Sequence, residues 1–300
     1  MIFKKATITI LFTAFLLAAC LPVNDNDFET NGEETVVQGD DDRISVESDD
    51  PILPEDADQV DPTAPPELSG EPPRGVQNEF PLTDFTTHSV SYDEILSGGP
   101  PRDGIPPIDQ PNFISVTEAD AWLQPVEPVI QLEINQEVKA YPIQILTWHE
   151  IVNDSVGGVP VVVTFCPLCN TAIAFERTMG EQVLSFGTTG RLRFSNLIMY
   201  DRQTETWWQQ ATGEGIVGAL TGSNLTFVPA AMVAWEEFKG AHPDGVVLSR
   251  ETGFNRTYGR NPYVGYDDVN RPPFLYQGPQ TPGELPPVAR VLALEFDGES

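Results

Sequence analysis

Short apolar runs separated by turn-forming residues occupy the chain beyond about residue 80, and they restrict the folds open to it. Apolar and polar side chains alternate over residues 129–134 and again over residues 137–141, on either side of an Asn-Gln pair that suits a hairpin turn. Residues 159–165 are continuously apolar, as in a buried strand. The 24 glycines and 28 prolines among 300 residues favour frequent turns. We therefore predict an α+β domain made mainly of antiparallel β-sheet with a few short helices.

Local signals place further elements in this domain. Ser115 followed by Glu118 has the spacing of a capping box and predicts a short helix within residues 114–121. Pro142 favours a helix over residues 143–152 that begins at the proline. An apolar stripe predicts another helix over residues 230–240. Further strands are expected at residues 172–177, 182–187, 197–200 and 206–209, with the first two forming one hairpin and the last two another.

The N-terminus has the features of a secretory signal. Lys4 and Lys5 precede an apolar run over residues 6–17, which ends in the sequence Leu-Ala-Ala-Cys at Cys20. This ending resembles a bacterial lipobox. We therefore expect residues 1–19 to be a signal peptide and Cys20 to carry a lipid that attaches the exported chain to the outer membrane or cell surface.

Charge separates a tether from the domain. Residues 21–74 hold 17 acidic residues against Arg43 and Arg74, without hydrophobic periodicity. Such a segment buries too little apolar surface to offset its ordering entropy, so we expect residues 20–75 to form a disordered acidic linker before a domain over residues 76–300. Over the whole chain, 16 basic and 45 acidic residues give a net charge of −29, which argues against nucleic acid as a partner.

Two cysteines and a histidine form the leading candidate site. Cys166 and Cys169 are separated by two residues where the predicted buried strand meets a turn, and His149 lies in the preceding predicted helix. Two thiolates at this spacing converge on one ion, and thiolates with an imidazole suit copper(I) or zinc. We therefore expect a soft-metal site at Cys166, Cys169 and His149, copper favoured over zinc, with Met199 as a distant fourth ligand.

The same residues also fit other functions. A Cys-x-x-Cys pair serves thiol–disulfide exchange, although residues 170–175 predict a strand and not the helix whose dipole usually activates such a pair. A structural disulfide would close a very short loop and remove little chain entropy. A cysteine nucleophile with His149 as base is a further alternative, and so is a simple packing role for His149. The neighbouring acids Glu150 and Asp154 are expected on a solvated face.

A second candidate site involves cations and aromatic rings. Arg191, Arg193 and Arg202 cluster in a domain with 12 basic residues, and they could hold an anionic ligand. The rings of Trp207 and Trp208, together with that of Tyr200, could then stack against this ligand. The alternative is that these arginines pair with local carboxylates and that the rings are core packing. The sequence thus supports a non-enzymatic ligand-binding module as a third functional class.

Three runs of sequence together resemble one known family. They cover residues 140–154, 162–172 and 185–208, and they include His149, Cys166, Cys169 and both tryptophans. In this order they are similar to a bacterial extracytoplasmic family catalogued as domain of unknown function 3179, over about residue 114 to the end. The resemblance implies no activity or cofactor. Residues 287–299 also echo residues 125–137, and members of the family continue past such a segment, so we expect that the chain stops inside a repeated unit.

Overall fold

The computed structural model describes residues 68–265, 268–280, 283–289 and 291. Three larger β-sheets and one two-stranded ribbon account for the strands of this part of the chain. Sheet A has the order β1-β10-β11-β12-β13, sheet B the order β14-β7-β6-β5, and sheet C the order β15-β3-β4-β16-β2. All pairs of neighbouring strands described are antiparallel except β4 with β16, so the predicted fold class is confirmed.

The strands are short, and each of the three larger sheets combines segments from distant parts of the chain. Sheet A contains β1 (Ile95–Ser97), β10 (Phe186–Arg193), β11 (Asn196–Asp201), β12 (Trp207–Gln209) and β13 (Glu214–Val217). Sheet B contains β14 (Phe227–Val228), β7 (Thr171–Glu176), β6 (Val159–Cys166) and β5 (Ile151–Val156). Sheet C contains β15 (Ala230–Ala234), β3 (Pro128–Ile134), β4 (Glu137–Pro142), β16 (Val246–Leu248) and β2 (Phe113–Ser115). The ribbon pairs β8 (Thr178–Met179) with β9 (Gln182–Val183).

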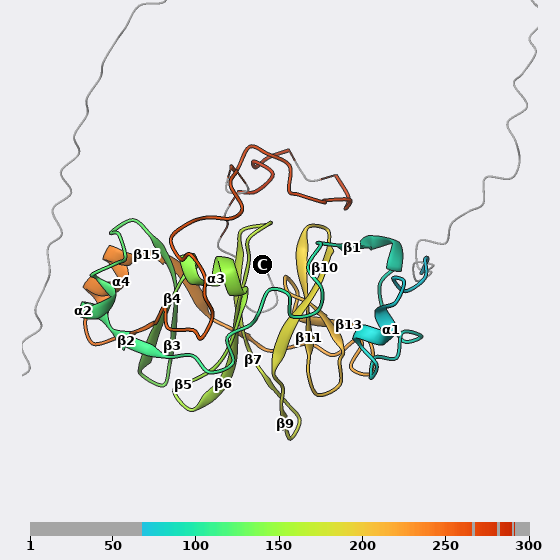
Figure 1. Cartoon of the computed structure of the whole chain (residues 1–300), viewed down its shortest axis with the longest axis horizontal. Helices are drawn as coiled ribbons and strands as arrows, with labels where there is room; N and C mark the ends of the chain where they lie inside the picture. The colour runs from blue at the N-terminus through green and yellow to red at the C-terminus, as the bar shows by residue number, and fades with distance from the viewer. Residues whose placement is uncertain (1–67, 266–267, 281–282, 290, 292–300) are drawn as a thin grey trace, which may run out of the picture. The chain divides into compact units, whose positions relative to one another are not determined.

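Sheet B is the middle layer of the domain (Figure 1). On one face of β6, Val161, Val163 and Phe165 share a hydrophobic core with β3 and β4 of sheet C. On the other face, Val162 and Cys166 share a core with β10, β11 and β12 of sheet A. Because β6 is covered on both faces, apolar side chains occupy successive positions instead of alternate ones.

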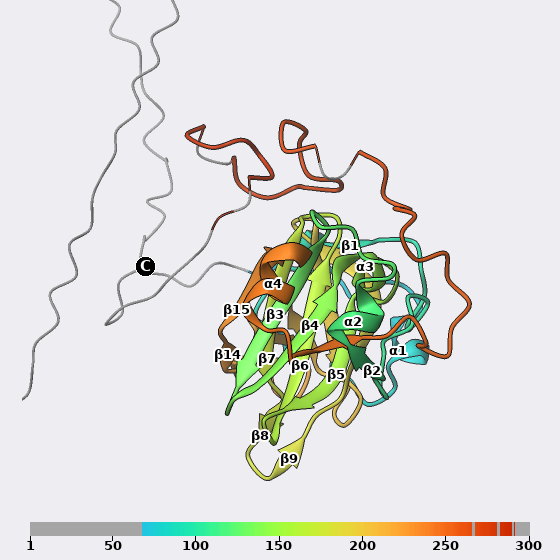
Figure 2. The ribbon, with the colours of Figure 1, turned by 90° about the vertical axis from the view of Figure 1, so that its left-hand side faces the viewer.

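Helices and an N-terminal segment cover the outer faces. The helices α2 (Val116–Ala119) and α4 (Trp235–Ala241) pack on the face of sheet C that points away from sheet B (Figure 2). On sheet A, the outer face is covered by a segment that includes α1 (Val76–Glu79) and the 3₁₀ helix η1 (Tyr92–Glu94). The remaining helix, α3 (Ile143–His149), lies between β4 and β5 and packs into the core shared by sheets B and C.

Several predicted elements are confirmed. The strands β3 and β4 form a hairpin whose turn residues Asn135 and Gln136 both have positive φ, at 49° and 71°. Such φ values at both central residues are typical of the type I′ turn, which matches the twist of the flanking strands. In α2, Ser115 and Glu118 form the expected capping box. The strands β11 and β12 pair across the expected turn.

Other predicted elements are wrong, and each error has a tertiary cause. The helix expected over residues 143–152 ends at His149, with Pro142 as its N-cap, because residues 151–156 pair with β6 as strand β5. The helix expected over residues 230–240 begins only at Trp235, because residues 230–234 pair with β3 as strand β15. The predicted hairpin partner of residues 172–177 is also wrong: β7 pairs with β6 and β14.

Some predictions lie outside the described residues. These are the signal peptide over residues 1–19, the lipid on Cys20, nearly all of the acidic linker over residues 20–75, and most of the repeat over residues 287–299. None of the helices that the structure describes has the length and apolar character needed to cross a membrane.

After β16, the chain continues without helix or strand through its described residues up to position 291. This C-terminal segment, which comprises residues 249–265, 268–280, 283–289 and 291, is drawn in orange-red and runs over one end of the sheets (Figures 1 and 2). Tyr258 bonds to the end of α3, and the ring of Tyr276 packs against Phe194 in the β10–β11 turn at 6.2 Å between centroids. The segment therefore links sheet B to sheet A across the ends of their strands.

Candidate functional site

The two cysteines lie in the tight turn that joins β6 to β7. Cys166 is the last residue of β6 and pairs with Thr171, the first residue of β7. Cys169 is in the turn between them, followed by Asn170 with φ of 54°. Both cysteines are free thiols. We call this turn, residues 166–171, the dithiol turn. Strand pairing across this short turn brings the two thiols close enough to interact.

The environments of the two sulfurs differ. Cys166 is 1% exposed, and its thiol donates a hydrogen bond to the Ser195 carbonyl at 3.6 Å. Cys169 is half-buried, and its sulfur accepts a hydrogen bond from Asn196 Nδ2 at 3.3 Å. Hydrogen bonds to a sulfur stabilise its thiolate form. The turn between β10 and β11 thus supplies an acceptor to one cysteine and a donor to the other.

The pKa values of the two thiols move in opposite directions. A hydrogen bond from the Cys166 thiol, with further bonds from Thr171 and Asn196, lowers the pKa of Cys169 to about 7 against the opposing effect of burial. Burial, together with the neighbouring Cys169 and Glu150, raises the pKa of Cys166 well above its ordinary value. At neutral pH, Cys169 is therefore partly ionised to the thiolate, whereas Cys166 keeps its proton.

A buried carboxyl group lies next to this pair. Glu150 follows α3, and its backbone carbonyl accepts a hydrogen bond from the Phe165 amide at 2.8 Å. Burial raises the pKa of Glu150 to about 8, the Cys169 charge adds to the rise, and a hydrogen bond from Tyr263 opposes it. The Tyr263 hydroxyl is 3.3 Å from Glu150 Oε1. The expectation that Glu150 and Asp154 lie on a solvated face is therefore wrong: both are buried, Glu150 beside Tyr263 of the C-terminal segment and Asp154 beside Lys139 and Tyr141 of β4.

The backbone around the thiols is strained. Glu150, Asn170, Phe194 and Ser195 all have φ between 51° and 65°, a region that residues other than glycine seldom adopt. They come from three segments of the chain: the end of α3, the dithiol turn and the β10–β11 turn. Strained backbone persists where surrounding contacts enforce it, and it gathers at functional sites.

His149 is engaged by other partners. Its Nδ1 donates to the Pro106 carbonyl at 2.7 Å, and its Nε2 accepts from the Tyr258 hydroxyl at 2.6 Å. Burial is the main cause that lowers the pKa of His149, and the Arg256 charge adds to it. The ring is therefore a neutral imidazole fixed between the loop before β2 and the C-terminal segment.

These contacts bear on the predicted metal site. Among the described residues, no group of three or more His, Cys, Asp or Glu side chains is arranged to hold a metal ion. Cys166 and Cys169 come together, but both ring nitrogens of His149 are already hydrogen-bonded. Met199 shares a hydrophobic core with Cys166. Copper or zinc binding at Cys166, Cys169 and His149 stays a prediction.

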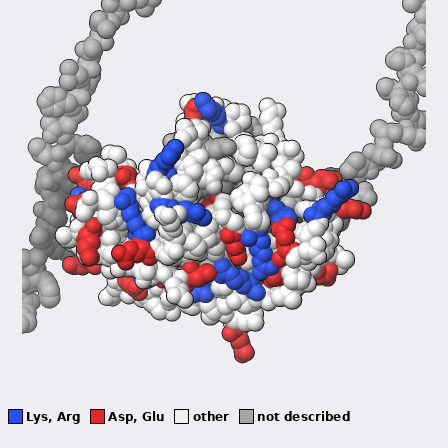
Figure 3. Space-filling model, viewed as in Figure 1, with Lys and Arg blue, Asp and Glu red and all other residues white. Residues whose placement is uncertain are grey.

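The arginines of the second candidate site each have a carboxylate partner. Arg191 pairs with Glu79 at 3.1 Å and Arg202 with Asp109 at 2.9 Å. Arg193 likewise pairs with Glu94, at 2.7 Å. Basic and acidic side chains are interleaved over the face of the molecule drawn in Figure 3. The guanidinium groups proposed for an anionic ligand thus already have anionic neighbours.

Trp207 and Trp208 are both fully buried. They are consecutive residues of β12, so their side chains point to opposite faces of sheet A. Trp207 packs with Phe80 and Phe85 against the N-terminal segment, whereas Trp208 packs with Phe186 in the core shared with sheet B. Neither ring has a face open to a ligand in this arrangement.

Sequence reasoning missed Asn196, Ser195 and Tyr263, and it assigned no chemical role to Glu150. Asn196 is itself held in place: its amide donates to Gln210 Oε1 at 2.6 Å and accepts from the Ala211 amide at 2.9 Å. No local pattern marks any of these residues as partners of Cys166 and Cys169.

Fold and site together define an antiparallel β-sheet protein with a partly buried dithiol in a hairpin turn. A family model described as protein of unknown function DUF3179 matches residues 102–300, about two thirds of the chain. The chain belongs to this family, as its motifs predicted. A search of curated proteins found no match, and a search of solved structures found none either.

Proposed function

We propose that the chain is a thiol–disulfide oxidoreductase whose redox pair is Cys166 and Cys169. The observation that carries this proposal is the asymmetry of the pair: Cys169, partly buried and hydrogen-bonded at its sulfur by Asn196, lies beside the fully buried Cys166. An attacking thiolate needs a pKa near the ambient pH and access to its substrate, and the resolving thiol needs neither. The pKa of Cys169, about 7, suits the attacking thiolate, and the fully buried Cys166 suits the resolving thiol.

The reaction proceeds in two exchanges. The Cys169 thiolate attacks one sulfur of a disulfide R–S–S–R′, forms a mixed disulfide with R–S, and releases R′–S⁻, which takes a proton from water. Cys166 then loses its proton to the ionised form of Glu150, whose population grows as the pH approaches its pKa of about 8, and attacks the Cys169 sulfur. The Cys166–Cys169 disulfide forms and R–S⁻ leaves. One substrate disulfide is reduced to two thiols, and the protein dithiol is oxidised by the same two electrons.

The first test uses the purified chain with Cys20→Ser, so that Cys166 and Cys169 are its only thiols. The reduced protein is mixed with the uncharged bis(2-hydroxyethyl) disulfide. We expect the parent to form an internal disulfide, Cys166→Ser to stop at the mixed disulfide, and Cys169→Ser to react about 100-fold more slowly. Intact mass and thiol titration follow all three. Equal rates for the two variants would overturn the assignment of Cys169 as the attacking group.

Soft-metal binding is the second candidate, because the dithiol turn holds two sulfur ligands together. It ranks second because His149 would have to leave the Tyr258 hydroxyl to become a third ligand. Metal analysis of the chain beside Cys166→Ser and His149→Ala tests it. Stoichiometric copper or zinc in the parent, lost in both variants, would favour metal handling over exchange. Equally low metal in all three would remove this candidate.

We also propose that the domain works outside the cytoplasm, attached through a lipid on Cys20. The support is the basic start, apolar run and Leu-Ala-Ala-Cys ending of the N-terminus. A dithiol in an oxidising compartment needs a reductant to turn over, which makes the redox state of Cys166 and Cys169 in intact cells a direct measure of its role. Mass spectrometry of the mature N-terminus tests the lipid attachment.

A further inference from the structure

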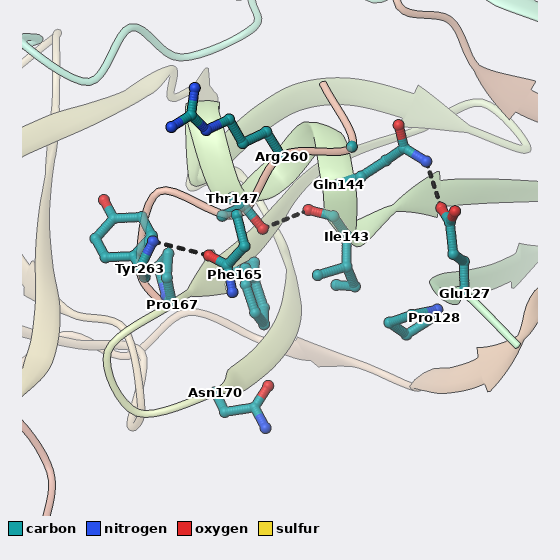
Figure 4. Close-up of a pocket in the computed structure, with 12 residues that line it drawn as sticks. Glu127, Pro128, Ile143, Gln144, Thr147, Phe165, Pro167, Asn170, Arg260 and Tyr263 are labelled. Carbon is teal, nitrogen blue, oxygen red and sulfur yellow. Dashed lines mark hydrogen bonds between the residues drawn. The ribbon is translucent and has the colours of Figure 1, made fainter. Parts of the chain in front are cut away.

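One pocket of about 300 Å³ lies beside the dithiol turn (Figure 4). Its walls come from four segments: the start of β3, α3, the end of β6 with the dithiol turn, and the C-terminal segment. Pro167 and Asn170, which belong to the dithiol turn on either side of Cys169, both line it. This volume is at the small end of ligand pockets, so it suits a compact molecule.

The pocket carries one negative and one positive side chain. Glu127 and Arg260 both line it, and they lie on opposite sides of Gln144 in Figure 4. Among the described residues, neither Glu127 nor Arg260 takes part in an ion pair within 4.0 Å. Most other cations of the domain have carboxylate partners, so two unpaired opposite charges around one hollow form a distinctive feature.

Neighbouring groups hold the negative end in place. The Gln144 side-chain amide donates to Glu127 and accepts from Arg250, so Arg250 fixes which way the amide points. Arg250 in turn lies over the ring of Trp122, with its guanidinium carbon 4.3 Å from the ring centroid. Glu127 thus has a fixed position and interacts electrostatically with Arg250, although no cation pairs with it within 4.0 Å among the described residues. Arg260 is exposed, on the opposite rim.

The surface between the two charges is apolar. This apolar part consists of Ile143, Phe165 and Pro167, which provide contacts for methylene groups and sulfur, and polar side chains such as Thr147 and Asn261 line the rest. A ligand that matches these features has an ammonium group, a carboxylate and a short sulfur-containing chain. The disulfide of a sulfur-containing α-amino acid carries an ammonium and a carboxylate on each half, so the ammonium of one half and the carboxylate of the other lie on either side of the sulfurs.

We infer that the pocket between α3 and the dithiol turn binds a small disulfide with free α-amino and α-carboxyl groups, and that this disulfide is the substrate of the pair; the inference rests on the proposed exchange activity. The ammonium of one half lies at Glu127, the carboxylate of the other half at Arg260, and the disulfide between them, toward the dithiol turn. With cystine as substrate, Cys169 forms a mixed disulfide with one half and releases one cysteine. Closure of the Cys166–Cys169 disulfide then releases the second, so two cysteines form as one protein disulfide forms.

The test compares substrates and measures binding separately. In the Cys20→Ser chain, the second-order rate constants for cystine and for bis(2-hydroxyethyl) disulfide are measured under the same conditions. We expect the ratio to favour cystine, and to fall about tenfold in Arg260→Gln and in Glu127→Gln. Lys239→Gln removes one positive charge from the distant helix α4 and is expected to leave the ratio unchanged. Calorimetry with lanthionine, the thioether analogue of cystine, reports binding without any redox step.

The outcomes separate the two proposals. If the uncharged disulfide reacts but the ratio stays near one in every protein and lanthionine does not bind, the pocket assignment is overturned while exchange stands. If no disulfide reacts, the exchange activity is overturned. If lanthionine nevertheless binds saturably, and more weakly to Arg260→Gln, the pocket is an amino-acid site but not the substrate site of an exchange reaction. A ratio that falls equally in Lys239→Gln would indicate net charge instead of the pocket, and would also overturn the assignment.

Discussion

Two buried carboxyl groups four residues apart, one within β5 and one just before it, differ in how their charge is neutralised. Asp154, within β5, accepts hydrogen bonds from Lys139 Nζ at 3.1 Å and from the Tyr141 hydroxyl at 2.7 Å. Glu150, just before β5, has no cation beside it among the described residues, and its pKa is raised to about 8. The charge of buried Asp154 is balanced by its ion pair with Lys139, whereas Glu150 avoids a buried charge by keeping its proton.

In the proposed exchange reaction, this difference distinguishes a structural acid, Asp154, from a reactive one, Glu150. Lys139 is itself almost fully buried, and its ammonium nitrogen lies 4.2 Å from the centroid of the Phe113 ring. Its charge therefore interacts with other buried groups and not with solvent. A carboxyl that takes up and releases a proton near neutral pH has no use in a core, but it can exchange protons with a neighbouring thiol. The comparison predicts four measurable differences between the two acids and their surroundings.

The pH dependence of stability gives the largest effect. The pKa of Glu150 is about 8 in the folded chain, above its ordinary value of 4.5. Below pH 4.5 the group is protonated in both states and its contribution to stability is complete; as the pH rises from 4.5 to 8 only the unfolded chain ionises, and the free energy of unfolding falls. The full effect is on the order of 5 kcal/mol. Urea unfolding across this range, compared with Glu150→Gln, isolates it. Parallel curves for the two proteins would contradict a raised pKa.

The second-largest effect is expected from removing the cation beside Asp154. Lys139→Met leaves a buried carboxylate without its partner, which we expect to lower the free energy of unfolding by about 3–5 kcal/mol at pH 7. Lys239→Met serves as the control, because its ion pair with Asp120 lies at the surface and contributes little. Urea unfolding measures both. Equal stability of the two variants would show that the buried pair is no more important than a surface one.

The reactive carboxyl should be needed for closing the protein disulfide. Glu150→Gln is expected to slow resolution of the Cys169 mixed disulfide about 100-fold, because Cys166 loses its proton acceptor. The parent rate should rise with pH through about 8, the pKa of Glu150, and the variant should lack this rise. Stopped-flow thiol release measures the step. Asp154→Asn provides the contrast: it is expected to weaken the fold and to keep the pH profile, and loss of the profile there would contradict the division of roles.

The smallest effect concerns the hydrogen bond to Cys169. Asn196→Ala is expected to raise the pKa of Cys169 above about 7 by roughly one unit, since a hydrogen bond to a charged group contributes about 1.5 kcal/mol. Asn196→Asp, of nearly the same size, should raise it further through repulsion between like charges. Thiolate absorbance at 240 nm against pH measures the shift, with exposed Asn78→Ala as the control. An unchanged titration in Asn196→Asp would exclude Asn196 as the donor.

The local part of the fold could be predicted from short patterns. The β3–β4 turn depends on Asn135 and Gln136 themselves, and the α2 capping box on Ser115 and Glu118, so each signal lies within a few residues. The errors lie where a distant strand competes for the backbone. Residues 150–152 were expected to be helical, yet Ile151 and Val152 pair with Thr164 and Val163 of β6. Their apolar character suits either state, and only the available partner decides.

The sequence by itself determined the antiparallel sheets, the family and the meeting of two thiols, because strand pairing across a short turn brings Cys166 and Cys169 together whatever surrounds them. Tertiary structure decided what those thiols can do. Asn196 reaches Cys169 from 27 residues away, and Tyr263 reaches Glu150 from 113 residues away. Burial, charge and hydrogen-bond donors set the reactivity of a thiol, and these properties arise only when segments remote in the sequence enclose it.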